Sequence, residues 1–194
     1  MPEFYEAMFF IVRKMAAVKN RPGGYELLTE KGGRLGEIEA SVRGGLGRLL
    51  IEGGIGLPRR INVTDLQGRT IVDIRKPFGL KSFSAQILGA DGKPMGRVRM
   101  GRRAMGMAGQ RLEVQDASGK PLGSLVGDWR AWNVQLFDDN GGLLGKIARK
   151  AENVNRVIYA DVDHYQVELS KPVTGELRRR LLLSVAASLG LLMS

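Results

Sequence analysis

The chain has 194 residues and no cysteine, which excludes disulfides, thiol catalysis and cysteine-ligated metal sites. Its 30 lysines and arginines exceed its 20 aspartates and glutamates, for a formal net charge of +10. A surplus of this size favours an anionic partner, such as phospholipid headgroups, nucleic acid or an acidic protein. The alternative is a basic protein without such a partner. The length predicts a single domain over residues 1–194.

The first part of the chain lacks the pattern of a targeting signal. Acidic Glu3 and Glu6 stand where a secretion signal needs basic residues, so we expect a cytoplasmic protein. The run Met8–Val18 predicts a strand, and its two basic residues argue against a membrane span. The glycine-rich stretch Arg43–Pro58 predicts a connection or strand, because it does not end in the lysine and hydroxyl residue of a phosphate loop.

Between Tyr25 and Arg149 one pattern recurs five times: two runs of alternating apolar and polar residues joined by a short polar turn. Each turn contains a glycine, namely Gly32, Gly68, Gly92, Gly119 and Gly141. This pattern is typical of β-hairpins, in which glycine supplies the positive φ that the turn requires. A further pair of strands is predicted within Arg156–Leu169, which gives six hairpins and twelve strands in all.

Apolar residues occupy one face of these predicted strands and polar residues the other. The apolar positions are Ile61 and Val63, Phe83, Ala85 and Ile87, Gly96, Val98 and Met100, Val134 and Leu136, and Tyr165, Val167 and Leu169. Twelve strands with one buried face favour a closed antiparallel β-barrel, because an open sheet of that size leaves unpaired edges. A barrel this wide has a lumen that its own side chains do not fill.

The end of the chain predicts a hydrophobic helix at about residues 174–193. Three arginines, Arg178–Arg180, precede the fourteen uncharged residues Leu181–Ser194. A helix that is apolar on every face is buried in a core or in a bilayer, and this one is shorter than a span of ~20 residues. We therefore interpret it as the filling of the lumen, with the arginines at the mouth. In the alternative, it anchors the protein in a membrane and the arginines flank the span on the cytoplasmic side.

A cluster of basic residues is the strongest candidate for a binding surface. Arg97 and Arg99 are two positions apart, so they project from one face of a predicted strand, and Arg102 and Arg103 follow. Guanidinium groups bind phosphate through paired hydrogen bonds. Lys76 and Lys81 complete the candidate lipid-binding set, with Arg13, Lys14, Arg149 and Lys150 as supporting residues. The alternative is a solvated outer face of the barrel.

Catalytic signatures are absent from the sequence. The single histidine, His164, is predicted to lie in a turn beside Asp163, without a nucleophile at a spacing that would pair with it. No G-x-S-x-G, paired-carboxylate or nucleotide-binding motif is present. We therefore expect a protein that is not an enzyme and has no cofactor.

Several segments together resemble the phospholipid scramblase family. They are GLLGKIARK (142–150), RVIYADVDHYQVEL (156–169), the RRRLLLSVAASLGLLMS tail and DLQGRTIVDIRKPF (65–78). Their order, over residues 45–194, is also similar to that of the LURP-one-related branch of the same tubby C-terminal-like fold. The resemblance implies a twelve-stranded barrel around a C-terminal helix. It also implies binding to anionic phospholipid, with movement of lipid between leaflets as a further role.

The chain departs from the eukaryotic scramblases in three respects. It has no cysteine cluster after the basic-proline segment and no proline-rich N-terminal tail. The segment that corresponds to their proposed Ca²⁺ loop has carboxylates at two of the ligand positions, Asp161 and Asp163, and ends in Pro172 rather than in an acid. Two carboxylates do not provide the six or more oxygens that Ca²⁺ takes, so the sequence favours a solvated turn over a metal site.

These observations together predict a scramblase-like, non-enzymatic protein that binds anionic phospholipid at the periphery of a membrane. A soluble regulatory or nucleic-acid-binding protein on the same fold ranks second, because few aromatic residues accompany the arginines. A scramblase with its tail in the bilayer ranks third. The oligomeric state is left open.

Overall fold

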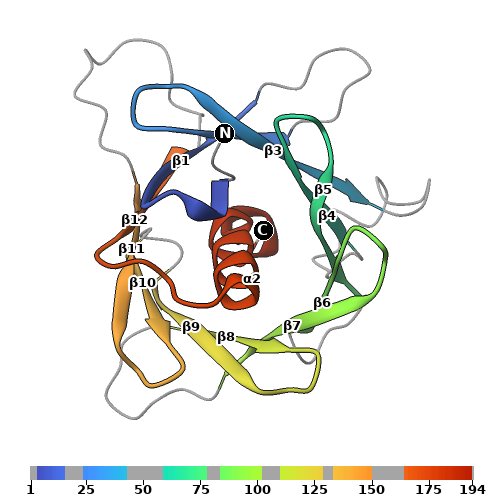
Figure 1. The fold of residues 1–194 in the computed structure, drawn as a ribbon, viewed down its shortest axis with the longest axis vertical. Coiled ribbons are helices and arrows are strands. Elements are labelled where there is room, and N and C mark those ends of the chain that lie inside the picture. Colours follow the sequence, from blue (N-terminus) through green and yellow to red (C-terminus); the bar gives the residue numbers. More distant parts are fainter. Residues whose placement is uncertain are drawn as a thin grey trace.

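Twelve strands and a C-terminal helix make up most of the residues that the structure describes, and the strands enclose the helix (Figure 1). The computed structural model describes residues 4–15, 24–42, 59–77, 84–101, 110–128, 133–149 and 164–193. The strands are β1 (Phe9–Lys14), β2 (Gly24–Leu28), β3 (Arg34–Val42), β4 (Arg59–Asp65), β5 (Thr70–Lys76), β6 (Ser84–Leu88), β7 (Pro94–Met100), β8 (Gln110–Asp116), β9 (Pro121–Asp128), β10 (Asn133–Asp138), β11 (Leu143–Arg149) and β12 (His164–Leu169). A 3-10 turn, η1 (Phe4–Glu6), precedes β1, and helices α2 (Glu176–Ala187) and α3 (Leu189–Met193) follow β12.

Each strand pairs antiparallel with its neighbours in the sequence, and β1 pairs with β12 to close the barrel. In this closing ladder Phe10 is opposite Val167 and Val12 is opposite Tyr165. All four of these side chains are buried, so the seam is part of the core. The closed, mainly β architecture predicted from the sequence is confirmed.

The twelve strands differ from the prediction in one pair. The sequence pattern predicted a sixth hairpin within Arg156–Leu169, of which only β12 falls among the described residues. The partners of β12 are β11 and β1, so β1 and β12 form the pair that completes the twelve. His164 accordingly begins a strand, opposite Arg13, instead of lying in a hairpin turn. Local alternation identifies a strand but not a partner that lies more than 150 residues away.

The predicted apolar faces of the strands form the core, with one exception. Buried residues include Ile61, Val63, Ala85, Ile87, Val98, Val134, Leu136, Tyr165, Val167 and Leu169. Met100 was predicted to share the buried face of β7, but the residue is 37% exposed because it lies at the end of that strand. Phe83 lies outside the described residues.

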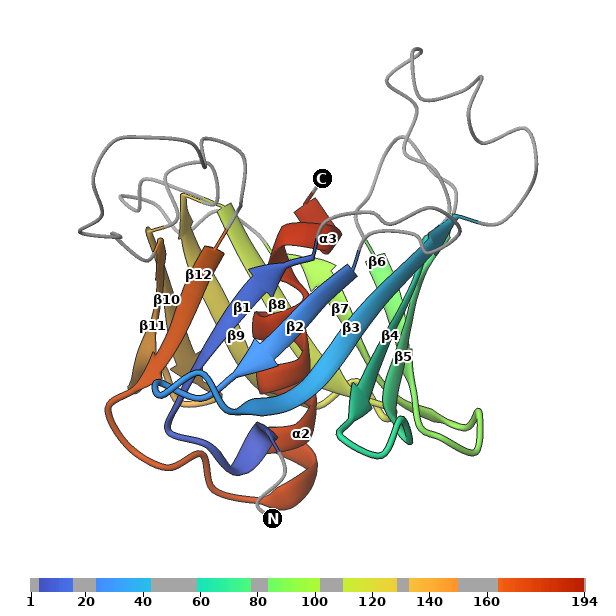
Figure 2. The same ribbon diagram turned by 90° about the horizontal axis from the view of Figure 1, so that it is seen from above.

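Helices α2 and α3 fill the lumen, one above the other along the barrel axis (Figure 2). Their fully buried apolar side chains are Leu181, Leu182, Leu183, Val185, Ala186, Ala187, Leu189 and Leu192. Tyr165 of β12 ties the wall to the helix, because its buried hydroxyl donates a hydrogen bond to the carbonyl oxygen of Ala187. Burial raises the pKa of the Tyr165 phenol, so it remains a neutral donor. Among the described residues, none of the helices has the length and apolar character that a membrane crossing requires.

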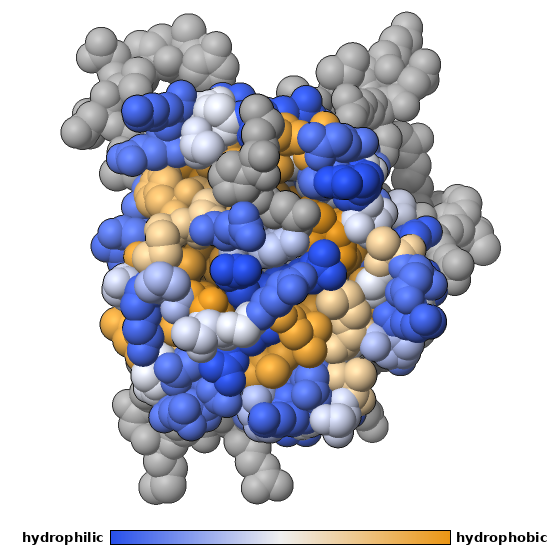
Figure 3. Space-filling model, in the orientation of Figure 1, coloured by the Kyte–Doolittle hydropathy of each residue, from blue (hydrophilic) through white to orange (hydrophobic). Residues whose placement is uncertain are grey.

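The barrel has two different ends. Five short turns, at residues 29–33, 66–69, 89–93, 117–120 and 139–142, lie at one end together with η1 and the start of α2 (Figure 2). Helix α3 lies at the other end. Seen from the short-turn end, hydrophilic residues occupy the rim and the centre, with hydrophobic residues between them (Figure 3).

The three arginines lie at the mouth of the lumen where α2 enters, as the lumen-filling interpretation predicts. Arg178 pairs with Asp139 at 2.7 Å and Arg179 with Glu6 at 3.8 Å. The guanidinium of Arg180 lies 5.4 Å from the ring centre of Tyr5, within reach of a cation–π interaction. These contacts fix the start of the helix against η1 and the turn after β10.

The short turns make the stability of the barrel sensitive to acid. The Ser118 hydroxyl and the backbone N–H groups of Lys120 and Ser118 donate to Asp116 and hold its pKa below the usual 3.8. The N–H groups of Gly142 and Asn140 do the same for Asp138. A carboxylate whose pKa is lowered by folding stabilises the folded state above its unfolded pKa, and that contribution is lost as the pH falls through its folded pKa.

We therefore expect the free energy of unfolding to decline as the pH falls below the ordinary value of 3.8. Urea unfolding at a series of pH values measures this decline. The Asp116→Asn variant is expected to show a shallower decline, because its amide oxygen accepts the same hydrogen bonds without titrating. A decline as steep as that of the unsubstituted chain would contradict the role assigned to Asp116.

Candidate anion-binding site

Charge is distributed unevenly along the barrel axis. Each strand has two terminal residues at the end of the barrel near α3. Over the twelve described strands, these residues include nine cations and one carboxylate. The cations are Arg13, Lys14, Arg59, Arg60, Arg75, Lys76, Arg99, Arg111 and Arg149, and the carboxylate is Asp128. At the short-turn end, the two terminal residues of each strand include one cation, Arg34, and the four carboxylates Asp65, Asp116, Asp138 and Glu168. An anion is therefore attracted to the end of the barrel at which α3 lies.

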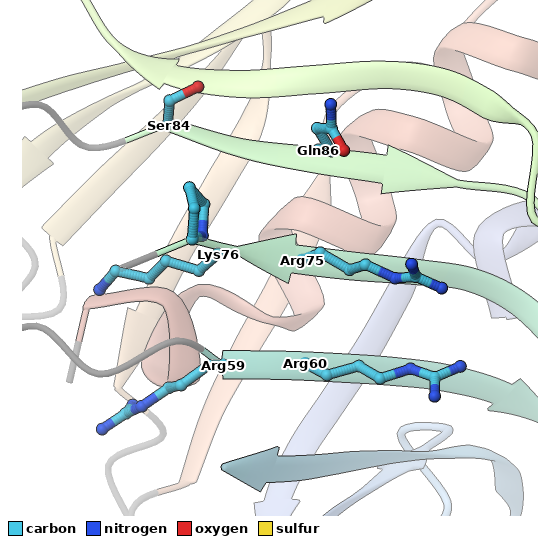
Figure 4. Close-up of a pocket in the computed structure, with 7 residues that line it drawn as sticks. Arg59, Arg60, Arg75, Lys76, Ser84 and Gln86 are labelled. Carbon is cyan, nitrogen blue, oxygen red and sulfur yellow. The ribbon is translucent and has the colours of Figure 1, made fainter. Parts of the chain in front are cut away.

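A cavity of about 410 Å³ opens at this end, over the strands β4, β5 and β6. Its described lining residues are Arg59, Arg60, Arg75, Lys76, Pro77, Ser84 and Gln86 (Figure 4). Strands β5 and β6 pair over only three positions, of which Arg75 and Gln86 are the last. Beyond Arg75 and Gln86 the two strands form no further ladder pair, which leaves room for the cavity.

Four cations line the cavity, and two of them contact the end of α3. Arg59 and Lys76 are opposite each other in the β4–β5 ladder, and they extend in the same direction (Figure 4). Arg59 Nη1 donates to the carbonyl oxygen of Leu191 at 2.9 Å, and Lys76 Nζ donates to that of Leu192 at 3.3 Å. Cations stabilise the negative end of a helix. Burial, and secondly the charge of Arg59, lower the pKa of Lys76.

The other two cations share one carboxylate. Arg60 and Arg75 are the next pair in the same ladder and extend the opposite way (Figure 4). The Oδ1 atom of Asp73 accepts from Arg60 Nε at 3.0 Å, and its Oδ2 atom accepts from Arg75 Nε at 2.9 Å and Nη2 at 2.8 Å. The Asp73 side chain is 5% exposed, whereas those of Arg60 and Arg75 are about half exposed. One buried carboxylate thus orients two guanidinium groups and neutralises one of their two charges.

The structure brings only part of the predicted lipid-binding set to this cavity. Lys76 lines it. Arg97 and Arg99 project from the outer face of β7, as predicted, but they do not line the cavity. Arg97 Nε donates to Gln115 Oε1 at 2.7 Å, and Arg99 forms an ion pair with Glu113 at 3.0 Å. Both contacts join β7 to β8. These two arginines therefore stabilise the pairing of the two strands on the outer surface of the sheet.

The remaining predicted site residues lie outside the described part of the chain: Lys81, Arg102, Arg103 and the calcium candidates Asp161 and Asp163. Among the described residues, no group of three or more histidine, aspartate or glutamate side chains could hold a metal ion. Of the supporting candidates, Arg13 pairs with Glu26 at 2.5 Å.

The sequence analysis did not select Arg59, Arg60 and Arg75, although a signal for them is present. The dipeptides Arg59-Arg60 and Arg75-Lys76 lie at nearly equal distances from the turn that contains Gly68. A hairpin centred on that turn places the two dipeptides opposite each other, as the observed ladder does. The symmetry of basic residues about a predicted turn could thus have indicated a four-cation cluster.

Comparison with known proteins bears on the fold. No family model and no curated protein matches the sequence. The structure is similar to the X-ray structure of an Arabidopsis thaliana protein, AT5G01750, a LURP-one-related protein. The TM-score is 0.54 at 13% sequence identity, over 95% of this chain and 89% of that chain. This likeness shows the fold alone. The closed barrel around its C-terminal helix is consistent with the tubby-like fold.

Proposed function

We propose that this protein is a non-enzymatic, scramblase-like module that binds anionic phospholipid at the cytoplasmic surface of a membrane. The observation that carries the proposal is the cavity lined by Arg59, Arg60, Arg75 and Lys76. A phospholipid phosphate is an anion at neutral pH, and guanidinium groups bind it through paired, charge-assisted hydrogen bonds. The four cations have one buried carboxylate, Asp73, among them.

The uneven charge of the barrel supports an orientation for this binding. The cation-rich end is the one that an anionic leaflet attracts, at ~1 kcal/mol for each cation near the surface. The same cations would attract nucleic acid. However, the two tyrosines among the described strand residues at this end, Tyr25 and Tyr165, are buried and so present no ring for base stacking. The scramblase resemblance, which implies anionic phospholipid, is the reason to favour a lipid headgroup as the ligand.

Flotation with vesicles tests the proposal. We expect the protein to float with vesicles in which phosphatidylserine replaces part of the phosphatidylcholine, and to remain behind with phosphatidylcholine alone. Two triple variants with the same net charge locate the site: Arg60→Gln/Arg75→Gln/Asp73→Asn at the cavity and Arg97→Gln/Arg99→Gln/Glu113→Gln on β7. The cavity variant is expected to bind the anionic vesicles about tenfold more weakly, and the β7 variant to bind almost normally.

Three outcomes would contradict this assignment. Equal flotation with neutral and anionic vesicles would reject anionic lipid binding. An equal loss in both variants would show that net charge alone is responsible, and a larger loss in the β7 variant would return the site to Arg97 and Arg99. Movement of phospholipid between leaflets is the further role that the scramblase resemblance suggests, and a fluorescent-lipid assay on the same vesicles measures it.

A further inference from the structure

The last helical turn of the chain is a separate short element. Helix α2 ends at Ala187, Ser188 adopts φ −96° and ψ 4°, and α3 follows from Leu189 to Met193. The N–H groups of Leu191 and Leu192 both donate to the carbonyl oxygen of Ser188. The last carbonyls of a helix have no acceptor role within it and need donors from elsewhere. Here Arg59 and Lys76 provide those donors, to Leu191 and Leu192.

Both side chains also line the cavity (Figure 4). A phosphate oxygen carries negative charge, whereas a backbone carbonyl is neutral. An ion pair with phosphate adds a charge–charge attraction that a hydrogen bond from a cation to a neutral carbonyl lacks. An anion in the cavity therefore draws Arg59 and Lys76 away from the two carbonyls.

Alone, α3 is too short to be a stable helix. Five residues are far fewer than an isolated helix needs to be stable. Leu189 and Leu192 are buried, while Gly190 and Leu191 are only partly so. The hydroxyl of Tyr165 donates to the carbonyl oxygen of Ala187, just before the break, and also contacts the backbone of Leu189 and Gly190 at the start of α3. Loss of the two cationic contacts is therefore expected to act at Leu191 and Leu192, beyond the residues that Tyr165 contacts.

We propose that anion binding in the cavity and closure of α3 compete for Arg59 and Lys76, so that the bound anion opens the last helical turn. This inference rests on the proposed function of the cavity. Because coupling between two equilibria is reciprocal, opening of α3 also strengthens anion binding. Opening exposes apolar Leu189 and Leu192 at the end of the barrel that faces the leaflet.

Amide hydrogen exchange followed by NMR tests the coupling, with dihexanoyl phosphatidic acid and inorganic phosphate as separate probes. At saturating probe we expect exchange at Leu191 and Leu192 to accelerate on the order of tenfold, the effect of losing two helix-end cations. Exchange at Val98 and Leu125 in the barrel wall is expected to stay unchanged. Acceleration by both probes, or by the lipid alone, supports the inference for a lipid headgroup. Acceleration by inorganic phosphate alone supports it for a free anion and argues against a lipid.

Two single variants separate anchoring from binding. In Lys76→Met, exchange at Leu192 is expected to be fast without a probe and to change little when it is added. In Arg60→Gln, a cavity cation that does not contact α3 is removed, so exchange without a probe should be normal while the affinity for the probe falls. If a probe shifts the Arg75 and Gln86 resonances but leaves exchange at Leu191 and Leu192 unchanged, the inference is overturned and the proposed function stands. If neither probe binds, the proposed function itself fails.

Discussion

Deletion of Leu181–Ser194 is expected to abolish the folded barrel rather than to release a soluble one. The deleted segment contains six large apolar side chains with no exposed surface: Leu181, Leu182, Leu183, Val185, Leu189 and Leu192. Burial of each contributes ~1.5–3 kcal/mol, or roughly 9–18 kcal/mol gross, which is an upper estimate. The net stability of a domain is ~5–15 kcal/mol. Without the helix, the inner faces of the strands would border a water-filled lumen.

Circular dichroism, the dispersion of the amide NMR signals and the soluble yield measure the effect of this deletion. A milder variant, Leu182→Ala, is expected to remain folded and to lose about 2–5 kcal/mol, because it leaves a cavity between the helix and the wall. Leu177→Ala is the matched control, since Leu177 belongs to the same helix but is 41% exposed. A deletion product that is soluble and unfolds cooperatively would show that the barrel stands without its helix.

This result would also separate the two interpretations of the hydrophobic tail. A membrane anchor can be removed without harm to the domain it tethers, whereas the filling of a core cannot. The contacts at the mouth favour the second interpretation, because Arg178 pairs with Asp139 in the turn after β10 and Arg179 with Glu6 of η1. The lumen and the helix therefore have to be considered as one core.

The fold could be predicted because its determinants are local in the sequence. Alternation along a strand shows which face is buried, as Ile61 and Val63 do, and the turn glycines mark the centres of five hairpins. The closing pair could not be predicted in the same way. Strands β1 and β12 are separated by almost the whole chain. Each shows an apolar face in the sequence, but nothing in the sequence of either strand identifies the other as its partner.

The candidate site was predicted less well, because it depends on register between strands. The spacing of Arg97 and Arg99 correctly placed them on one outer face of β7. Their partners, Gln115 and Glu113, come from β8, and no turn within the described residues fixes that register. The four cations of the cavity likewise come from two strands, and Asp73 orients two of them from a buried position that composition does not reveal.

Replacement of Gly96 by valine is expected to destabilise the barrel strongly, because the helix packs closely against the wall at this position. A Cβ atom on Gly96 would lie 2.3 Å from the carbonyl oxygen of Gln115 and 2.8 Å from Cδ1 of Leu181. The first of these atoms is backbone and cannot move without disturbing the β7–β8 ladder. We expect a loss of at least the ~1–3 kcal/mol typical of an overpacked core. Chemical unfolding measures it.

Two companion variants show whether the cause is the contact with the helix. Gly96→Ala combined with Leu181→Ala should cost less than the sum of the two single changes, because the shorter side chain at 181 removes one of the two clashes. Gly92→Asn is the control in the turn before β7. Its φ is +76° and no atom lies within 4 Å of the added Cβ, so only the backbone conformation is tested, and asparagine tolerates that conformation. Strict additivity of the alanine pair would mean that α2 does not rest on Gly96, and the close fit of helix to wall would then have to lie elsewhere in the lumen.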